Sequence, residues 1–543
     1  MNRHHRRLVA SFALFLASCR GCQKDTGSLV DLAAPDARAV VMVPSLTTLA
    51  KNLGAFTSAA TKRAGKEALD GARRSLVEQL GFDPFTPKGF KASGVDPDRG
   101  IVMFTEGNAA QAILAVHVDD RAAFGNWLKG MAQRAGASKV TSETRDGVTF
   151  DLASRPFGTE SAPTLAWGFV GDDALIASAD AIDSFVVAMK RLGTRQSGAA
   201  VASTPLTKDP TYLALSSKVE GGDVRVFARG APPVDGEKAQ SAGIVASLSL
   251  GGTGLRLDSF VDFKVEGLAA ALDGEPPLPL GKRVEDDAVA VALTRIAKPE
   301  GIAALRGSPL TKNGVEQALD RFKRATQLDL ENDLMKVLAG PLTVGVHVMD
   351  LNDLPQALAR RLGMNAVLEF VHVTISAEVK DREALITLLD RSKGQLEEQG
   401  NKVNKRSATI GGKEAVIYEP SGDRPSIGWG VIDNFYVYGA GRGRIERAMA
   451  QVLPQAPGGV APKLTSGVAN ELGQARGSFL VVVRAAALAD NVAKLQKSQD
   501  AVVMAVMPMV SQGIEVLRTI GDVAVAAKVE KDGVRIEARQ KLQ

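Results

Sequence analysis

The 543-residue chain has only two cysteines, Cys19 and Cys22, and few aromatic side chains, which make up 5% of its residues. Both cysteines lie in the first 22 residues, so no intrachain disulfide is expected to stabilise the body of the protein. Hydrophobic residues make up 45% of the chain, enough for two or more domains with sizeable cores. Because aromatic residues are few, Ala, Val and Leu must fill those cores.

Long apolar runs are also absent behind the leader. The longest such stretch, Ala501–Val510, is interrupted by Pro508 and is too short to cross a bilayer as a helix. The nearby Met504, Met507 and Met509 lie in a region with helical spacing, where methionines form either a core or an adaptable binding surface.

The motifs of common enzyme classes are missing as well. The sequence contains no Gly-x-Ser-x-Gly elbow, no complete phosphate-binding P-loop and no His-Glu-x-x-His. Three histidines follow the leader, and each lies in a strand-like run without a second histidine at metal-ligand spacing: His117, His347 and His372. We therefore expect each of these histidines to lie on the polar face of its strand rather than to bind a metal. No cofactor is expected, and we do not expect an enzyme.

One glycine-rich turn has the context of a phosphate site. Gly439-Ala440-Gly441-Arg442-Gly443 follows a predicted strand and precedes a predicted helix, whose N-terminus would favour an anion. The spacing departs from Gly-x-Gly-x-x-Gly, and the matching turn Ala177–Asp180 has no glycine. Pairs of Asp such as Asp119-Asp120 and Asp172-Asp173 stand at turns or helix starts, where Asp caps free backbone N–H groups.

The first nineteen residues carry the most specific signal. Arg3, Arg6 and Arg7 form a basic leader, and an uncharged run from Leu8 to Ser18 follows. The segment Leu16-Ala17-Ser18-Cys19 resembles the lipobox of bacterial lipoproteins. The resemblance implies that Leu16, Ala17 and Ser18 are recognised by a signal peptidase and that Cys19 carries the lipid. It also implies a membrane partner held through acyl chains, each buried CH₂ contributing roughly 0.8 kcal/mol.

Cleavage before Cys19 would remove three arginines and lower the formal charge from +5 to 5 − 3 = +2. No long Lys/Arg block remains, so a nucleic-acid partner is not expected. Arg20 follows the cysteine where many lipoproteins retained in the inner membrane have Asp, which favours the outer membrane. Cys22 is left as a second acylation site, an intermolecular disulfide partner or an incidental thiol.

The rest of the chain consists of two halves that resemble each other at a spacing close to 260 residues. Four segments of the first half recur in the same order in the second. The matched pairs are Pro163–Gly168 with Pro425–Gly430, Val118–Phe124 with Val379–Leu385, Asp36–Met42 with Asp287–Leu293, and Gly254–Leu257 with Gly533–Ile536. Trp167 and Trp429 occupy equivalent places, and we expect each to anchor the core of its own half.

The repetition predicts a signal peptide at 1–18, a flexible tether at 19–34, a first repeat at 35–273, a linker at 274–284 and a second repeat at 285–543. Within a half the hydrophobic period alternates between two and 3.6. Hairpins are expected around Glu106–Asn108, Asp146-Gly147, Gly171–Asp173 and Gly251-Gly252, with helices at 47–80, 120–134 and 180–191. This pattern predicts an α+β fold of two tandem repeats, each a mainly antiparallel sheet with helices on one face.

The duplicated pattern, with its Asp-led opening strand and the segment Leu328–Leu334, resembles a bacterial envelope-protein family of unknown function. That resemblance implies similar strand-and-helix blocks behind a signal or anchor, and it brings no catalytic residues. The leading hypothesis is a lipid-anchored envelope protein that acts as a non-enzymatic binding or scaffold module on a periplasmic or surface membrane face, with an apolar ligand or an envelope protein as its partner. The alternatives are a carrier of a lipid or other apolar ligand, with a cavity between sheet and helices, and a hydrolase with scattered carboxylates.

Overall fold

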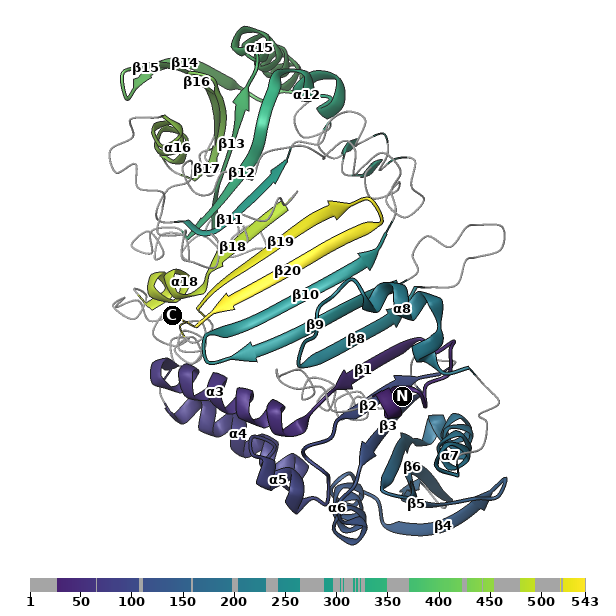
Figure 1. Ribbon diagram of the computed structural model, residues 1–543. Helices are drawn as coiled ribbons and strands as arrows, with labels where there is room; N and C mark the ends of the chain where they lie inside the picture. Colours follow the sequence, from purple (N-terminus) through teal and green to yellow (C-terminus); the bar gives the residue numbers. More distant parts are fainter. Residues whose placement is uncertain are drawn as a thin grey trace. The chain divides into compact units, whose positions relative to one another are not determined.

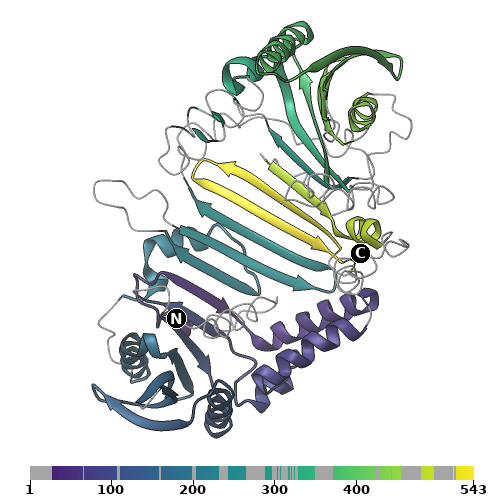
Figure 2. The same cartoon turned by 180° about the vertical axis from the view of Figure 1, so that it is seen from behind.

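The computed structural model (Figures 1 and 2) describes most of the chain after residue 26. The described residues are 27–64, 66–106, 111–157, 160–197, 204–230, 243–263, 288–295, 328–348, 371–421, 427–441, 443–453, 479–493 and 521–542, with isolated positions between 303 and 323 and Arg518. The chain divides into two compact units, Met1–Phe263 and Lys264–Gln543. Each contains helices and an antiparallel sheet, so the fold is α+β. The predicted linker, 274–284, lies outside the described residues.

The first unit is built on an antiparallel sheet. Its strands are β1 (Ala39–Val43), β2 (Ile101–Thr105), β3 (Ala112–His117), β4 (Lys139–Arg145), β5 (Val148–Phe157), β6 (Glu160–Val170), β7 (Asp173–Ser178), β8 (Val224–Arg229), β9 (Gly243–Gly251) and β10 (Gly254–Asp262). Neighbouring strands pair in the order β4-β5-β6-β7-β3-β2-β1-β8-β9-β10. All four predicted hairpins of this unit pair as expected.

The helices of the first unit are α2 (Gly27–Val30), α3 (Leu46–Ala64), α4 (Lys66–Leu80), α5 (Pro87–Ala92), α6 (Arg121–Arg134), α7 (Ile182–Gln196) and α8 (Pro210–Ser216), with short 3-10 turns at Ala179–Ala181 and Leu206–Lys208. Three of these helices, α5, α6 and α8, begin at a side-chain cap, and a proline starts α5 and α8. Asp120 caps α6 by accepting hydrogen bonds from the backbone N–H groups of Ala122 and Ala123 at 2.9 and 3.0 Å. Gly54 lies inside α3, and the helix continues through it.

The second unit repeats this order of pairing. Its strands are β11 (Ala288–Arg295), β12 (Leu338–Val348), β13 (Val371–Val379), β14 (Val403–Ile410), β15 (Lys413–Pro420), β16 (Ile427–Ile432), β17 (Phe435–Ala440), β18 (Phe479–Arg484), β19 (Asp522–Glu530) and β20 (Gly533–Lys541). They pair in the order β14-β15-β16-β17-β13-β12-β11-β18-β19-β20. Every described pairing of the first unit therefore has a counterpart ten strands later.

The second unit's described helices are α12 (Met335–Val337), preceded by the short helical turn Leu330–Leu334, and α15 (Arg382–Glu398), α16 (Arg444–Val452) and α18 (Ala485–Ala493). Asp381 caps α15 by accepting from Ala384 N–H at 2.9 Å, as Asp120 caps α6. Asp329 accepts from the N–H group two residues on, Glu331, at 3.1 Å, and Asp83 of the first unit accepts from Phe85 in the same way at 3.1 Å.

Helices cover both faces of the sheet formed by β3 to β7, and this corrects the expectation of helices on one face. Trp167 packs on the same side as Phe124 and Leu128 of α6, whereas its neighbour Ala166 packs on the same side as Phe185 of α7. Successive strand residues point to opposite faces, so α6 and α7 lie on opposite sides. In the second unit, α15 and α16 likewise pack on the two faces of the sheet formed by β14 to β17, which curls around α16 (Figure 1).

A second correction concerns the predicted tether at 19–34. Residues 27–34 belong to the first unit, because Leu29, Val30, Leu32 and Ala33 are each 1% exposed and pack with Phe227 and Phe260. The run is too short to show a hydrophobic period, which is why its sequence gave no signal of an ordered segment.

Candidate functional site

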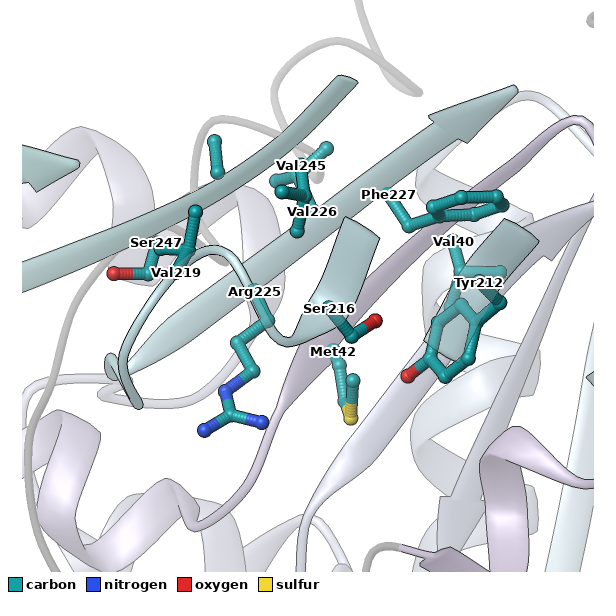
Figure 3. Close-up of a pocket in the computed structure, with 11 residues that line it drawn as sticks. Val40, Met42, Tyr212, Ser216, Val219, Arg225, Val226, Phe227, Val245 and Ser247 are labelled. Carbon is teal, nitrogen blue, oxygen red and sulfur yellow. The ribbon is translucent and has the colours of Figure 1, made fainter. Parts of the chain in front are cut away.

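A polar niche lies between α8 and the sheet in the first unit (Figure 3). Its apolar floor comes from β1, β8 and β9, and its other wall comes from α8 and the segment behind it. The floor residues are Val40, Met42, Phe227 and Val245. Three strands and a helix therefore converge on one small cavity.

The position of α8 is fixed at its first turn. Pro210 starts the helix, and Asp209 caps it by accepting from Tyr212 N–H at 2.8 Å. Arg229 donates to Asp209 at 3.0 Å and to the carbonyl oxygen of Pro35 at 2.6 Å. These contacts tie the start of α8 to the end of β8 and to the segment before β1.

The distinctive residue of the niche is Arg225. Residues two apart in a strand point to the same face of the sheet, so Arg225 shares with Phe227 the face of β8 that α8 covers. Directly across the ladder it faces Met42 of β1 and Ser247 of β9. The side chain is half-buried, and its Nε is buried without a hydrogen-bond partner among the described residues.

The turn that precedes β8 lies close against this side chain. A Cβ at Gly221 would stand 2.7 Å from Arg225 Nη2, and a Cβ at Gly222 would stand 2.8 Å from Ser247 Cβ. At Gly222 only glycine lets the turn approach β9 this closely. Gly221 leaves the guanidinium room in its present position, and a larger residue there would move the flexible end of Arg225.

Hydroxyl groups complete the lining, from Tyr212, Ser216 and Ser247. Burial raises the pKa of Tyr212, and the nearby carboxylate of Asp31 adds to this, while the hydrogen bond with Ser216 and the charge of Arg225 act in the opposite direction. The net pKa lies above its usual value, so the phenol stays protonated at neutral pH. The niche thus combines one cation with three neutral hydroxyls.

The cavity has a volume of about 10 Å³, which is room for one water molecule. A second cavity, lined only by apolar side chains such as Phe82, Leu114 and Trp127, has a volume of about 30 Å³. Neither of these two cavities could hold an acyl chain, because ligand pockets have volumes of hundreds of cubic ångströms.

The three histidines lie in strands as predicted, but two of them are buried rather than on a polar face. His117 is 1% exposed and pairs through Nδ1 with the carboxylate of Asp173. His347 is fully buried, with Nε2 3.1 Å from Thr374 Oγ1. His372 is half-buried and accepts from Arg444 Nε at 3.1 Å. The polar-face interpretation was wrong for His117 and His347 because partners on the neighbouring strands satisfy a ring nitrogen in each.

The glycine-rich turn between β17 and α16 has a packing role. A Cβ at Gly439 would stand 2.7 Å from Ile445 N, and a Cβ at Gly441, whose φ is +121°, would overlap the His372 ring. Arg444 is 4% exposed and donates to His372. The glycines thus let α16 approach the sheet; Arg442 lies outside the described residues.

The matched tryptophans differ in burial. Trp167 is fully buried against α6, whereas Trp429 is half-buried and stacks on Tyr418 with ring centroids 6.4 Å apart. The predicted lipidation and signal residues, Leu16, Ala17, Ser18 and Cys19, lie outside the described residues, as do Cys22 and Met504 to Met509.

In the part of the chain that the structure describes, no three His, Cys, Asp or Glu side chains cluster as a metal site. None of the described helices is long and apolar enough to cross a membrane.

Comparisons with known proteins give little further information. No protein-family model matches the chain, and no curated protein matches it. A solved structure described as crystal form IV of TP0453 aligns with 45% of this chain and 83% of its own, at 8% identity and a TM-score of 0.25. A likeness at that level carries no argument about fold or function.

Sequence reasoning did not find Arg225, because none of the four matched segments covers β8. The signal that could have found it is the repeat extended beyond those segments, because aligning β8 with β18 places Arg225 opposite Leu480, a charged residue in place of a core leucine.

Proposed function

We propose that this chain is a lipid-anchored envelope protein whose body is a duplicated, non-enzymatic binding or scaffold module. The anchor is proposed from the basic leader and the segment Leu16-Ala17-Ser18-Cys19, which resembles a lipobox. Arg20 after the cysteine favours delivery to the outer membrane, on its periplasmic or surface face.

The single observation that carries the scaffold proposal is the shared order of strand pairing in the two units. A tandem duplication accounts for it together with the sequence matches, the Asp caps of α6 and α15, and the Asp83 and Asp329 turns. It also accounts for Arg229 and Arg484, at equivalent ends of β8 and β18. Arg229 donates to Pro35 O, just before β1, at 2.6 Å, and Arg484 donates to Ala288 O, the first residue of β11, at 3.1 Å. A duplicated body of this kind presents two similar surfaces to partners in the envelope.

The carrier alternative would require a large apolar cavity. The two cavities described above, of about 10 and 30 Å³, do not supply one, so a carrier would depend on residues outside the described part, including Met504 to Met509. The hydrolase alternative, with scattered carboxylates, would require at least two carboxylates to converge on one cleft. Neither of the two cavities described above is lined by an Asp or Glu side chain.

The anchor is tested with Cys19→Ala in the native host. We expect this variant to move from the membrane fraction to the soluble fraction and to lose metabolic labelling with palmitate, because the thiol is the acylation site. The matched control is Cys22→Ala, three residues along the same leader, which should stay in the membrane and stay labelled. Membrane retention of Cys19→Ala with undiminished labelling would refute the anchor.

A further inference from the structure

The niche around Arg225 places a cation where the duplicated unit has an apolar side chain. The equivalent residues Val40 of β1 and Val291 of β11 pair with Phe227 of β8 and Val482 of β18. Two positions before these partners stand Arg225 in β8 and Leu480 in β18, which are therefore equivalent. Leu480 is 1% exposed and forms part of a core. A guanidinium at that position loses hydration that leucine does not need.

Nothing among the described residues compensates for that loss by an ion pair or hydrogen bond to Arg225. Its Nε is buried and unpartnered. The carboxylate that acts on the nearby Tyr212, Asp31, accepts a hydrogen bond from Thr207. Asp223, two residues before Arg225, accepts a hydrogen bond from Leu250 N–H at 2.9 Å. The charge of Arg225 is therefore available to a ligand.

The surroundings suit an oxyanion. The guanidinium has a planar set of donors that matches the oxygens of a phosphate group, and hydroxyls of Tyr212, Ser216 and Ser247 add further donors. The end of α8 points its carbonyls toward this region, which would oppose an anion. Two of those carbonyls, of Leu213 and Leu215, are already bonded by the N–H groups of Ser217 and Lys218 at 3.1 and 2.9 Å.

We propose that Arg225, with the hydroxyls of the niche, binds a phosphate group at the cavity mouth. The cavity itself accepts about one water-sized atom group, so one phosphate oxygen enters and the rest of the ligand stays outside. A free phosphate and the phosphodiester headgroup of an anionic lipid share this chemistry. This inference does not depend on the scaffold proposal.

The test measures the thermal midpoint of the full chain, in detergent, against two probes at matched ionic strength in chloride. The probes are inorganic phosphate and glycerophosphoglycerol, the soluble headgroup of phosphatidylglycerol. We expect at least one probe to raise the midpoint at millimolar concentration, because a ligand that binds only the folded state stabilises it. A response to phosphate alone indicates a free anion, and a response to the diester indicates a lipid headgroup.

Three variants make the test specific. Arg225→Leu, which installs the second unit's residue, should lose at least tenfold in affinity while keeping or raising the ligand-free midpoint. Arg225→Lys should fall between the two, because it keeps the charge and loses the planar donor set. Arg145→Leu, on the exposed β4, should bind like wild type. No response of the wild type to either probe, an equal response of Arg225→Leu, or a large ligand-free loss of stability in Arg225→Leu would overturn the proposal.

Discussion

At the scale of single residues, the clearest electrostatic feature is the pair of His117 and Asp173, which face each other across β3 and β7. Burial alone raises the pKa of Asp173. The hydrogen bond and charge of His117, the hydrogen bond from Gln196 at 3.0 Å and the charge of Arg99 outweigh it, so the net pKa lies below the usual value. Ionised Asp173 therefore stabilises the folded state.

We expect Asp173→Asn to lower the free energy of unfolding at pH 7 by about 1 kcal/mol, because the amide keeps a hydrogen bond but loses the charge. A carboxyl whose folded pKa is lowered contributes stability above its unfolded pKa and loses it as the pH falls through the folded pKa. The difference in the free energy of unfolding between wild type and variant should thus be largest at pH 7 and vanish at low pH. Urea unfolding as a function of pH measures it. Asp172→Asn, at the exposed neighbouring turn residue, is the control, and an Asp173 effect that persists unchanged at the lowest pH would contradict this account.

Residue type and local pattern could place the histidines in strands but could not say whether they are buried. Burial depends on the partner strand, and the partners, Asp173 for His117 and Thr374 for His347, are 56 and 27 residues away. Arg225 was missed for the same reason. Its sequence neighbours form an ordinary strand, and only the helix packed over it shows that the side faces a niche.

At the scale of elements, the hairpins were predictable because their turns are chemically distinctive. Asp146 and Gly147 have φ of 51° and 80°, as a two-residue turn with both residues left-handed requires, and Gly411 and Gly412 do the same in the second unit at 56° and 77°. The covering of both sheet faces was not predictable, because each strand of a short hairpin alternates polar and apolar residues only weakly when both faces are buried.

The two helix caps provide a matched prediction. Asp120→Ala and Asp381→Ala should each lower the free energy of unfolding by about 1 kcal/mol, because each leaves backbone N–H groups at a helix start without the carboxylate acceptor. Asp120→Asn and Asp381→Asn should keep most of the stability, since Asn caps nearly as well. Urea denaturation of the four variants measures the differences. An alanine variant as stable as its asparagine counterpart would show that the cap contributes nothing there.

At the scale of the whole molecule, four short sequence matches predict two halves, and the chain divides into two compact units with the same order of strand pairing. Those matches could not predict the ordered segment 27–34, which precedes the first matched segment. They also could not reveal that the two units differ at Arg225, which lies between the third and fourth matched segments of the first half. Repeated sequence reports what two units share, whereas the function of one unit can reside in a position where they differ.

The cores of the two units draw on separate stretches of chain, residues 29–260 in one and 288–526 in the other. We therefore expect a cavity made in one core to shift that unit's unfolding transition alone. Phe185 is fully buried, and its ring centroid lies 5.4 Å from that of Phe150, so Phe185→Ala should lower the free energy of unfolding of the first unit by about 3–5 kcal/mol. Leu385 is also fully buried, and Leu385→Ala should lower the free energy of unfolding of the second unit by about 2–5 kcal/mol.

Tryptophan fluorescence separates the two transitions, because Trp127 and Trp167 lie in the first unit and Trp429 in the second. In a Trp127→Phe, Trp167→Phe background only Trp429 reports, and Leu385→Ala should move its urea midpoint while Phe185→Ala leaves it in place. In a Trp429→Phe background the two effects should be exchanged. Equal shifts of both reporters by either cavity would mean that the duplicated chain unfolds as one cooperative structure, and that the two cores do not act as independent sources of stability.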